Sequence, residues 1–258
     1  MKQFGIIPAA GLGTRLAPLP FSKEMYPIGY QSYNEELRPC PVSQYLVKSL
    51  KMAETDEVFF IINQSKTDIM SYYLNGQQFN MNFSYLIQTE PKGMVDALVK
   101  VSPWLPKEEY VITFGMPDTL FKPDSLFRQL VKKIKQKQNI DLILGVFPTE
   151  AWFKLGMTTV QKGKDGELEV IKIIDKPKIK PDTDYAWGIA VWKSKFQHFL
   201  TNYHHNYSEK AELVLGDVFS AALKEGFKVC ALKGELFLDI GTLEDLTKAI
   251  KYMDIGGG

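Results

Sequence analysis

The sequence predicts an α/β protein built on a Rossmann-like, doubly wound and mostly parallel sheet. Apolar runs of strand length alternate with amphipathic helix patterns through residues 1–148. Such alternation requires crossover connections, which place successive strands parallel in one sheet. After residue 148 the strand patterns become closely spaced, which predicts a small β-rich subregion on the same sheet.

The first half of the chain opens on an apolar run at residues 4–9, which is typical of a buried strand. Four further runs of this kind follow, and each gap between them carries a helical period. One helix is predicted to begin just after Pro123-Asp124, a common helix-start signal. The later strands are expected at 58–62, 83–87, 110–114 and 142–147, and the helices at 42–52, 67–73, 94–101 and 125–138.

The second half repeats the mixture with shorter spacing. Its strands are predicted at 158–161, 168–174, 186–192, 229–232 and 236–238, and its helices near 215–223 and 243–253. The polar stretch that carries His198, His204 and His205 is predicted to be a solvated loop. Because neither a repeat nor a low-complexity linker interrupts the pattern, we expect one domain over residues 1–255, with a disordered tail at 256–258.

Composition excludes several classes of function. The 31 basic and 30 acidic residues leave a formal net charge of +1, so nothing favours nucleic acid or an anionic membrane as a partner. No apolar stretch is long enough to cross a bilayer, and the N-terminus does not resemble a signal peptide. The two cysteines, Cys40 and Cys230, are far apart, which predicts free thiols in a reducing cytoplasm.

A glycine-rich turn directly follows the first predicted strand. Gly11 and Gly13 allow the backbone to approach a ligand closely, and backbone N–H groups in such a turn can point at phosphate oxygens. Thr14 adds a hydroxyl, and Arg15 and Lys23 add positive charge. The turn lacks the third glycine of the dinucleotide fingerprint and the Gly-Lys-Ser/Thr triplet of a Walker loop. These residues together predict a phosphate-binding site of another kind.

This stretch resembles the signature of the sugar 1-phosphate nucleotidylyltransferases, and most closely that of the glucose-1-phosphate thymidylyltransferase branch. The family carries Gly-x-Gly-Thr-Arg-Leu followed by a lysine before a Pro-Ile pair. The matching residues are Gly11, Gly13, Thr14, Arg15, Leu16, Lys23, Pro27 and Ile28. The resemblance implies that Ala10, Gly11, Gly13 and Thr14 bind the nucleotide and that Arg15 and Lys23 are catalytic.

A glutamine at the end of a predicted strand extends the likeness. An amide offers a donor and an acceptor side by side, which suits the edge of a nucleobase. Spacing alone would favour an ordinary loop glutamine. The family places Gln-x-x-Pro-x-Gly against the base, and Gln88, Pro91 and Gly93 match it. The next residues, 94–97, differ from the Leu-Ala-Gln-Ala run usual in thymidylyltransferases, which leaves the choice of base open.

Two carboxylates, Asp118 and Asp239, each follow a predicted strand. Either one could simply cap a helix or turn. Mg²⁺ prefers oxygen ligands and commonly takes only one or two carboxylates, with water and phosphate oxygens around it. The family resemblance implies that Asp118 and Asp239 hold Mg²⁺, although Met116 and Pro117 stand between Gly115 and Asp118 where the family has a Gly-Asp pair.

The family's Glu-Lys-Pro motif corresponds to Asp175-Lys176-Pro177. From the residues alone Lys176 would be an ordinary surface lysine. The resemblance implies that it grips the sugar phosphate as a catalytic residue. It likewise implies sugar contacts from Gly156, Asp175, Gly188 and Glu212. Leu155, Asp175 and Val214 depart from the family's residues, which predicts a different or less polar sugar pocket.

The resemblance therefore implies a nucleotidylyltransferase that joins a nucleoside triphosphate, dTTP or UTP, to a sugar 1-phosphate with Mg²⁺ and releases pyrophosphate. Residues 1–148 would form the nucleotide-binding half and residues 149–255 the sugar-binding half with the closing elements. Two alternatives stay open: a cytidylyltransferase acting on a non-sugar phosphate such as phosphocholine, and a catalytically silent nucleotide-binding relative. Members of the family are often oligomeric, so a homo-oligomer is also open.

Overall fold

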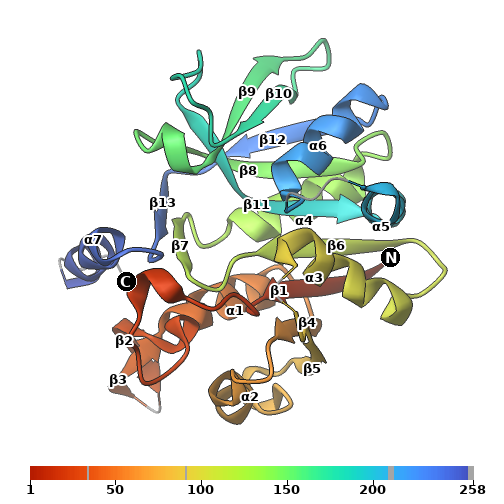
Figure 1. The fold of residues 1–258 in the computed structure, drawn as a ribbon. Helices are drawn as coiled ribbons and strands as arrows, with labels where there is room; N and C mark the ends of the chain where they lie inside the picture. The colour runs from red at the N-terminus through yellow and green to blue at the C-terminus, as the bar shows by residue number, and fades with distance from the viewer. Residues whose placement is uncertain (34, 91, 209–211, 255–258) are drawn as a thin grey trace.

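The computed structural model describes residues 1–33, 35–90, 92–208 and 212–254. Its centre is a nine-stranded sheet with helices packed on both faces (Figure 1). In spatial order the strands are β5 (Asn82–Ile87), β4 (Glu57–Ile62), β1 (Lys2–Pro8), β6 (Tyr110–Gly115), β11 (Tyr185–Lys193), β8 (Leu142–Pro148), β12 (Val229–Lys233), β10 (Leu168–Asp175) and β9 (Gly156–Lys162). The predicted α/β class is confirmed, and both halves of the chain contribute to this one sheet.

The sheet is mixed in direction, so the prediction of a mostly parallel sheet is wrong. Strands β5, β4, β1 and β6 are parallel neighbours, as are β8 and β12. Strand β11 runs antiparallel between β6 and β8, and β10 runs antiparallel to both β12 and β9. The alternating pattern predicted the strands themselves, but a strand's direction depends on how the connections cross the sheet, which periodicity does not encode.

Helices cover the two faces because neighbouring strand residues point to opposite sides. On one face Ile6 packs with α3 (Gly93–Val101), α5 (Ser194–Asn206) and α6 (Leu215–Lys224). On the other face Ile7 packs with α1 (Val42–Met52), α2 (Thr67–Tyr73) and α4 (Leu126–Gln136). A third, smaller core forms where α7 (Leu243–Asp254) packs beside β2 (Pro27–Tyr33).

Two short antiparallel ribbons lie apart from the main sheet. Strand β2 pairs with β3 (Glu36–Pro41), and β7 (Thr119–Lys122) pairs with β13 (Leu236–Asp239). Of these four strands the sequence predicted only β13. The remaining regular elements are the single 3₁₀ turns η1 (Thr14–Leu16), η2 (Lys23–Met25), η3 (Gln77–Phe79), η4 (Ser102–Trp104) and η5 (Trp152–Lys154).

The prediction of a solvated loop around the three histidines is wrong, because they lie on helix α5. Phe196 and Leu200 are fully buried against the sheet, and their spacing of four residues is that of one helix face. The polar residues that mask this stripe include His204, whose side chain is only 28% exposed. The predicted tail at 256–258 lies outside the described residues, and within the described ranges no helix is long and apolar enough to cross a membrane.

Candidate functional site

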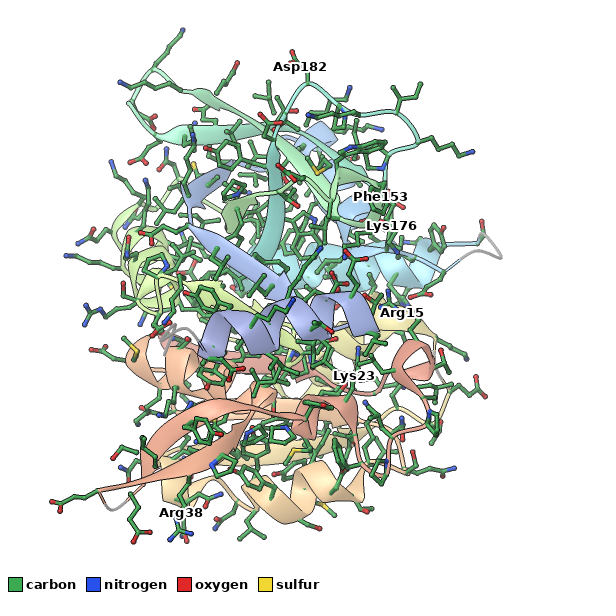
Figure 2. The ribbon with its side chains drawn as sticks, turned by 90° about the vertical axis from the view of Figure 1, so that its left-hand side faces the viewer. Arg15, Lys23, Arg38, Phe153, Lys176 and Asp182 are labelled. Carbon is green, nitrogen blue, oxygen red and sulfur yellow. The ribbon has the colours of Figure 1, made fainter. Side chains whose placement is uncertain are left out.

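A cavity of about 480 Å³ opens where the carboxyl ends of β1 and β6 face the start of β9 and the end of β10. Ligands of doubly wound sheets commonly bind at such strand ends. Figure 2 shows Lys176 above Arg15 and Lys23 on the same side of the molecule. The charged residues that line the cavity are Arg15, Lys23, Lys154 and Lys176, with Glu24, Asp118, Asp175, Glu212 and Asp239.

The glycine-rich turn after β1 forms one wall of this cavity. Gly13 adopts a left-handed backbone (φ 66°), which favours glycine, and a side chain there would meet the stem of Lys23. At Gly11 an added Cβ would find open space, so the backbone is accessible. The side chain of Asn63 donates a hydrogen bond to the carbonyl oxygen of Ala10 at 2.8 Å and ties the turn to the end of β4. Of this turn, Ala10 and Gly11 line the cavity, whereas Gly13 and Thr14 do not.

Lys23 forms a close ion pair with Asp118, its Nζ lying 2.5 Å from Oδ2. Both side chains are largely shielded, at 16% and 12% exposure. Burial alone would lower the pKa of Lys23, but the charge and hydrogen bond of Asp118 outweigh it, so the pKa is raised. The lysine therefore stays protonated and carries a fixed positive charge at the cavity wall.

Asp118 and Asp239 are brought together by the β7–β13 ribbon. Thr119 pairs with Asp239 across the ribbon, and the backbone N–H of Ile240 donates to the carbonyl oxygen of Asp118 at 3.0 Å. Burial raises the pKa of Asp239, and the negative charge of Asp118 raises it further. The effect of Asp118 on Asp239 indicates that the two carboxylates lie close to the same space.

Arg15 reaches the same corner as Asp239. A Cβ built on Gly241 would lie 2.8 Å from the Arg15 Nη2 and 2.9 Å from the Asp239 Oδ1. Only a residue without a side chain leaves room for both groups at this point. The backbone N–H of Gly241 also donates to Asp239 Oδ1 at 2.6 Å, which fixes the carboxylate.

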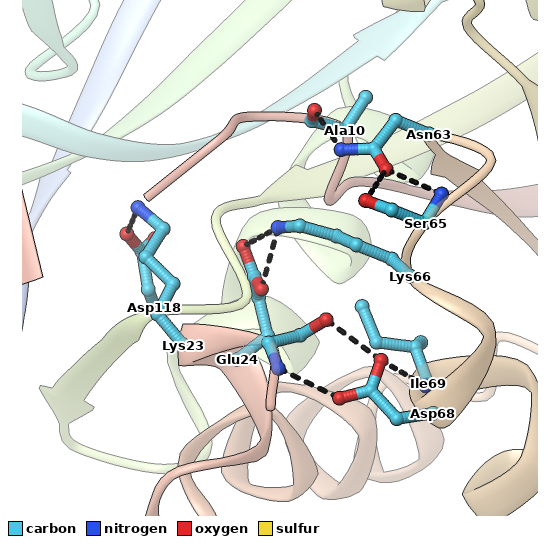
Figure 3. A network of polar contacts seen from close by, with 10 residues as sticks. Ala10, Lys23, Glu24, Asn63, Ser65, Lys66, Asp68, Ile69 and Asp118 are labelled. Atoms are coloured by element: carbon cyan, nitrogen blue, oxygen red, sulfur yellow. Dashed lines mark hydrogen bonds and ion pairs between the residues drawn. The ribbon is translucent and has the colours of Figure 1, made fainter. Parts of the chain in front are cut away.

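Below the cavity, a buried network holds η2 in place (Figure 3). Lys66 contacts both carboxylate oxygens of Glu24, at 2.8 and 2.7 Å, and both side chains are almost fully buried. Asp68 accepts hydrogen bonds from the backbone and hydroxyl of Ser22, each at 2.7 Å. Because Ser22 and Glu24 flank Lys23, these contacts from α2 and the segment before it fix where the lysine points.

The opposite wall comes from the end of β10. Asp175 pairs in register with Gly156 of β9. Its side chain lies close to Gly216 at the start of α6, where an added Cβ would be 3.3 Å from the Asp175 Cβ. Burial raises the pKa of Asp175, although nearby Lys176 opposes the shift. Lys176 has a positive φ of 42°, uncommon for a residue with a side chain, and its own side chain is 63% exposed. Strained backbone of this kind is characteristic of functional sites.

Two predicted sugar-contact glycines have different surroundings. Gly156 lines the cavity, and a Cβ there would lie 2.1 Å from Nε1 of Trp187, which also lines it. Gly188 is not among the lining residues. A Cβ at Gly188 would lie 2.4 Å from the ring of Phe237, so the glycine makes room for that ring.

Gln88 lines the cavity at the end of β5, together with Gly93 at the start of α3. Its Nε2 donates to the carbonyl oxygen of Gly93 at 3.1 Å and to Oδ2 of Asp96 at 2.7 Å. Glu212 lies against the same helix start, since a Cβ on Gly93 would fall 2.4 Å from its Oε1. Pro91, predicted to lie near the base, falls outside the described residues.

Sequence reasoning missed several residues of the site. Glu24 and Lys154 line the cavity beside residues that were predicted, but neither belongs to a motif. Trp187 lies next to Gly188 and could have been found from that neighbour. Lys66 and Asn63 act through contacts that span 42 and 53 residues of sequence, which no local signal reveals.

The donor set suits a hard divalent cation that shares its ligands with a substrate. Within the described ranges no three His, Cys, Asp or Glu side chains cluster to make a complete metal cage. Asp118 and Asp239 supply two carboxylates beside a cationic wall. Mg²⁺ commonly uses such a pair and completes its octahedron with water and phosphate oxygens.

The sequence is similar to those of known proteins and matches one protein family. The family described as "Nucleotidyl transferase" matches residues 4–254. The bifunctional protein GlmU of Thermodesulfovibrio yellowstonii is 25% identical over 96% of this chain, which spans 51% of that protein's length. The UTP–glucose-1-phosphate uridylyltransferase of Streptococcus pneumoniae serotype 4 is 28% identical over 67% of this chain and 63% of its own.

A solved structure of a candidate glucose-1-phosphate thymidylyltransferase from Bacillus anthracis, in complex with sucrose, superposes with a TM-score of 0.80. It is 25% identical and the alignment covers 97% of this chain and 95% of that one. These matches confirm the resemblance first indicated by the glycine-rich turn. Since the family match runs through nearly the whole sequence, the chain belongs to the nucleotidyl transferase family.

Proposed function

We propose that the protein transfers a nucleotidyl group from UTP or dTTP to a sugar 1-phosphate and releases pyrophosphate. The observation that carries the proposal is one cavity in which Arg15 and Lys23 stand beside the acid pair Asp118 and Asp239, with Lys176 on the facing wall. The family assignment and the named activity of the Streptococcus pneumoniae relative support the same reaction.

On the nucleotide side, residues 1–148 would hold the triphosphate. The exposed backbone of the turn at Ala10 and Gly11 suits phosphate oxygens, and Arg15 supplies a fork of donors for the leaving pyrophosphate. Lys23 would neutralise charge near the α-phosphate. Its ion pair with Asp118 holds the ammonium at the cavity in advance, so little ordering is needed when the nucleotide binds.

On the acceptor side, residues 149–255 would hold the sugar phosphate. Lys176, exposed at the cavity, would bind the nucleophilic phosphate, and Asp175 would accept hydrogen bonds from sugar hydroxyls. Gly156 leaves space that the indole of Trp187 partly fills. Leu155 and Val214 add apolar surface, which supports an acceptor with fewer hydroxyls on that side than a site of polar residues would take.

The chemistry needs positioning and charge neutralisation more than proton transfer. A phosphate monoester oxygen attacks the α-phosphorus, a new P–O bond forms, and the bond to the β-phosphate oxygen breaks. Because the attacking monoester is already an anion near neutral pH, no general base is required. Mg²⁺ held by Asp118 and Asp239 would supply electrostatic stabilisation of the transferring phosphate.

We also infer a reducing compartment such as the cytoplasm. Cys40 and Cys230 are both buried and free. Burial raises the pKa of the Cys40 thiol to about 12 and that of Cys230 to about 11, so both stay protonated and unreactive.

The proposal is tested by pyrophosphate release. The purified protein is incubated with Mg²⁺ and UTP, dTTP or CTP, each with glucose 1-phosphate or phosphocholine. We expect release with UTP or dTTP and the sugar phosphate, and loss of release when EDTA removes the metal. Turnover confined to CTP with phosphocholine would instead establish the cytidylyltransferase, and tight nucleotide binding without any turnover would establish a silent relative.

A further inference from the structure

The side-chain amide of Gln88 is held in one orientation. Nε2 carries two hydrogens, and both are used, one by the carbonyl oxygen of Gly93 and one by the carboxylate of Asp96. Both partners are acceptors without hydrogens of their own. An amide turned by 180° would place Oε1 against two oxygens, so the contacts assign the nitrogen and oxygen without ambiguity.

That orientation leaves the oxygen of the amide without a hydrogen-bond partner among the residues that the structure describes. Gln88 is 4% exposed and lines the cavity wall. Within the described ranges, no group donates a hydrogen bond to Gln88 Oε1. This oxygen is nevertheless not fully buried. Gln88 therefore presents an acceptor and no donor to whatever enters.

Asp96 is in turn held by its surroundings. It lies in the first turn of α3, with its side chain only 13% exposed. Lys100, one helical turn later, brings Nζ to 3.7 Å from Oδ2, and His204 on α5 brings Nε2 to 3.8 Å from Oδ1. These groups keep the carboxylate aimed at Gln88.

We propose that Asp96 is a positioning residue that makes Gln88 an acceptor-only reader of the nucleobase. This inference rests on the proposed function and on the position of Gln88 at the base that the family resemblance implies, and it adds the residue that sets the choice of base. Position 3 of uracil and thymine carries a hydrogen that Oε1 can accept, whereas position 3 of cytosine carries a lone pair. Setting two acceptors together in a shielded pocket leaves both unsatisfied, which weakens binding roughly 10-fold or more. The site thus selects uridine or thymidine nucleotides and rejects cytidine nucleotides.

The test measures nucleotide binding by isothermal titration calorimetry, without acceptor and without turnover. UTP, dTTP and CTP are titrated into the wild type, Asp96→Asn and Asp56→Asn. Asp56 is a matched control, because it is an exposed aspartate paired with Lys51 away from the cavity. Thermal unfolding of each variant establishes that it is folded.

We expect the wild type and Asp56→Asn to bind UTP roughly 10-fold or more tightly than CTP. Asp96→Asn replaces one of the two acceptors that hold Nε2 with an amide that can donate to Gln88 Oε1, so only the carbonyl oxygen of Gly93 still favours the wild-type orientation. The ratio of UTP affinity to CTP affinity should then fall at least about threefold. A general loss of structure would weaken the binding of both nucleotides and would not change this ratio.

Each other outcome has a distinct meaning. Equal binding of UTP and CTP by the wild type overturns the inference while leaving the proposed function intact. An unchanged ratio in folded Asp96→Asn also overturns it. If Asp96→Asn does not fold, Asp96→Ser, which shortens the side chain and removes its charge, takes its place in the same titrations, and an unchanged ratio of UTP affinity to CTP affinity overturns the inference. Failure of all three nucleotides to bind the wild type contradicts the proposed function itself.

Discussion

Lys23 and Asp118 meet at the cavity wall with 2.5 Å between Nζ and Oδ2. The contact joins the segment after the glycine-rich turn to the segment after β6, which lie 95 residues apart in sequence. The ammonium and the carboxylate are already held at the same space, so these side chains lose less freedom when a phosphate binds.

Removal of the Asp118 charge should abolish most of the activity. Asp118→Asn keeps the shape and loses the charge, so we expect turnover to fall on the order of 10²-fold or more. Pyrophosphate release at saturating substrate measures this. Asp124→Asn, at an exposed aspartate paired with Lys122, is the control and should behave as wild type. Full activity of Asp118→Asn with Mg²⁺ would remove Asp118 from the mechanism.

Lys176 should act on the acceptor and not on the nucleotide. We expect Lys176→Ala to raise the KM for the sugar phosphate by roughly tenfold or more, because a charge-assisted hydrogen bond is lost. Nucleotide affinity, measured by calorimetry, should stay unchanged. Lys180→Ala is the matched control, since Lys180 is similarly exposed and paired with Asp184. A change confined to nucleotide affinity would show that the lysine is misassigned.

The buried pair of Glu24 and Lys66 should matter for stability. Burial raises the pKa of Glu24 even though Lys66 opposes the shift, so the pair is held together at a desolvation cost. Glu24→Gln leaves Lys66 buried without its counter-charge and should lower the free energy of unfolding by about 3–5 kcal/mol.

Urea unfolding measures this loss, with Glu36→Gln as control because Glu36 and Arg38 form an exposed pair. A second variant, Glu24→Gln combined with Lys66→Met, removes both charges and should regain much of the lost stability. If Glu24→Gln alone is as stable as the wild type, water must reach the Lys66 ammonium freely in that variant.

Asp245 should make stability depend on pH in acid. Lys154 lies 2.6 and 2.7 Å from its two oxygens, and Thr242 donates to it at 2.6 Å. Burial alone would raise the pKa of Asp245, but these hydrogen bonds lower it below the ordinary value of 3.8. A lowered pKa in the folded state stabilises the protein fully above that ordinary value, and the contribution is lost as pH falls below it.

At pH 7 we expect Asp245→Asn to lower the free energy of unfolding by about 1–3 kcal/mol. The difference from wild type should shrink when unfolding is measured in increasingly acidic buffer below pH 3.8. Glu244→Gln on the same helix turn, where the glutamate is 78% exposed, is the control. A difference that stays constant through this range would show that the charge of Asp245 is not what stabilises α7.

Much of the fold could be predicted because local patterns dominate it. The buried apolar runs of β4 and β6 and the amphipathic pattern of α4 can be recognised from the local sequence, without knowing which elements they pack against. Strands β2 and β3 were missed because Pro27, Gly29 and Pro39 break the strand pattern, and they pair only with each other. Helix α5 was missed because histidines and asparagines near its end obscure the stripe formed by Phe196 and Leu200.

The site divides in the same way. Residues in motifs, such as Arg15 and Lys176, were found because the motif carries the information. Partners such as Asn63 and Asp96 were not, because their importance lies in what they touch. Asp96 was noticed only as a departure from the usual run of residues, and its contact with Gln88 gives that departure a physical meaning.

The ribbon of β7 and β13 has a mechanical consequence. Backbone pairing in the ribbon holds Asp118 beside Asp239. The separation of the two acids is therefore set by this local pairing, although they lie far apart in the sequence. The positions of Lys23 and Lys176, which come from η2 and from the end of β10, have no part in this pairing. The spacing of the acids is therefore independent of the distance between the two walls of the cavity.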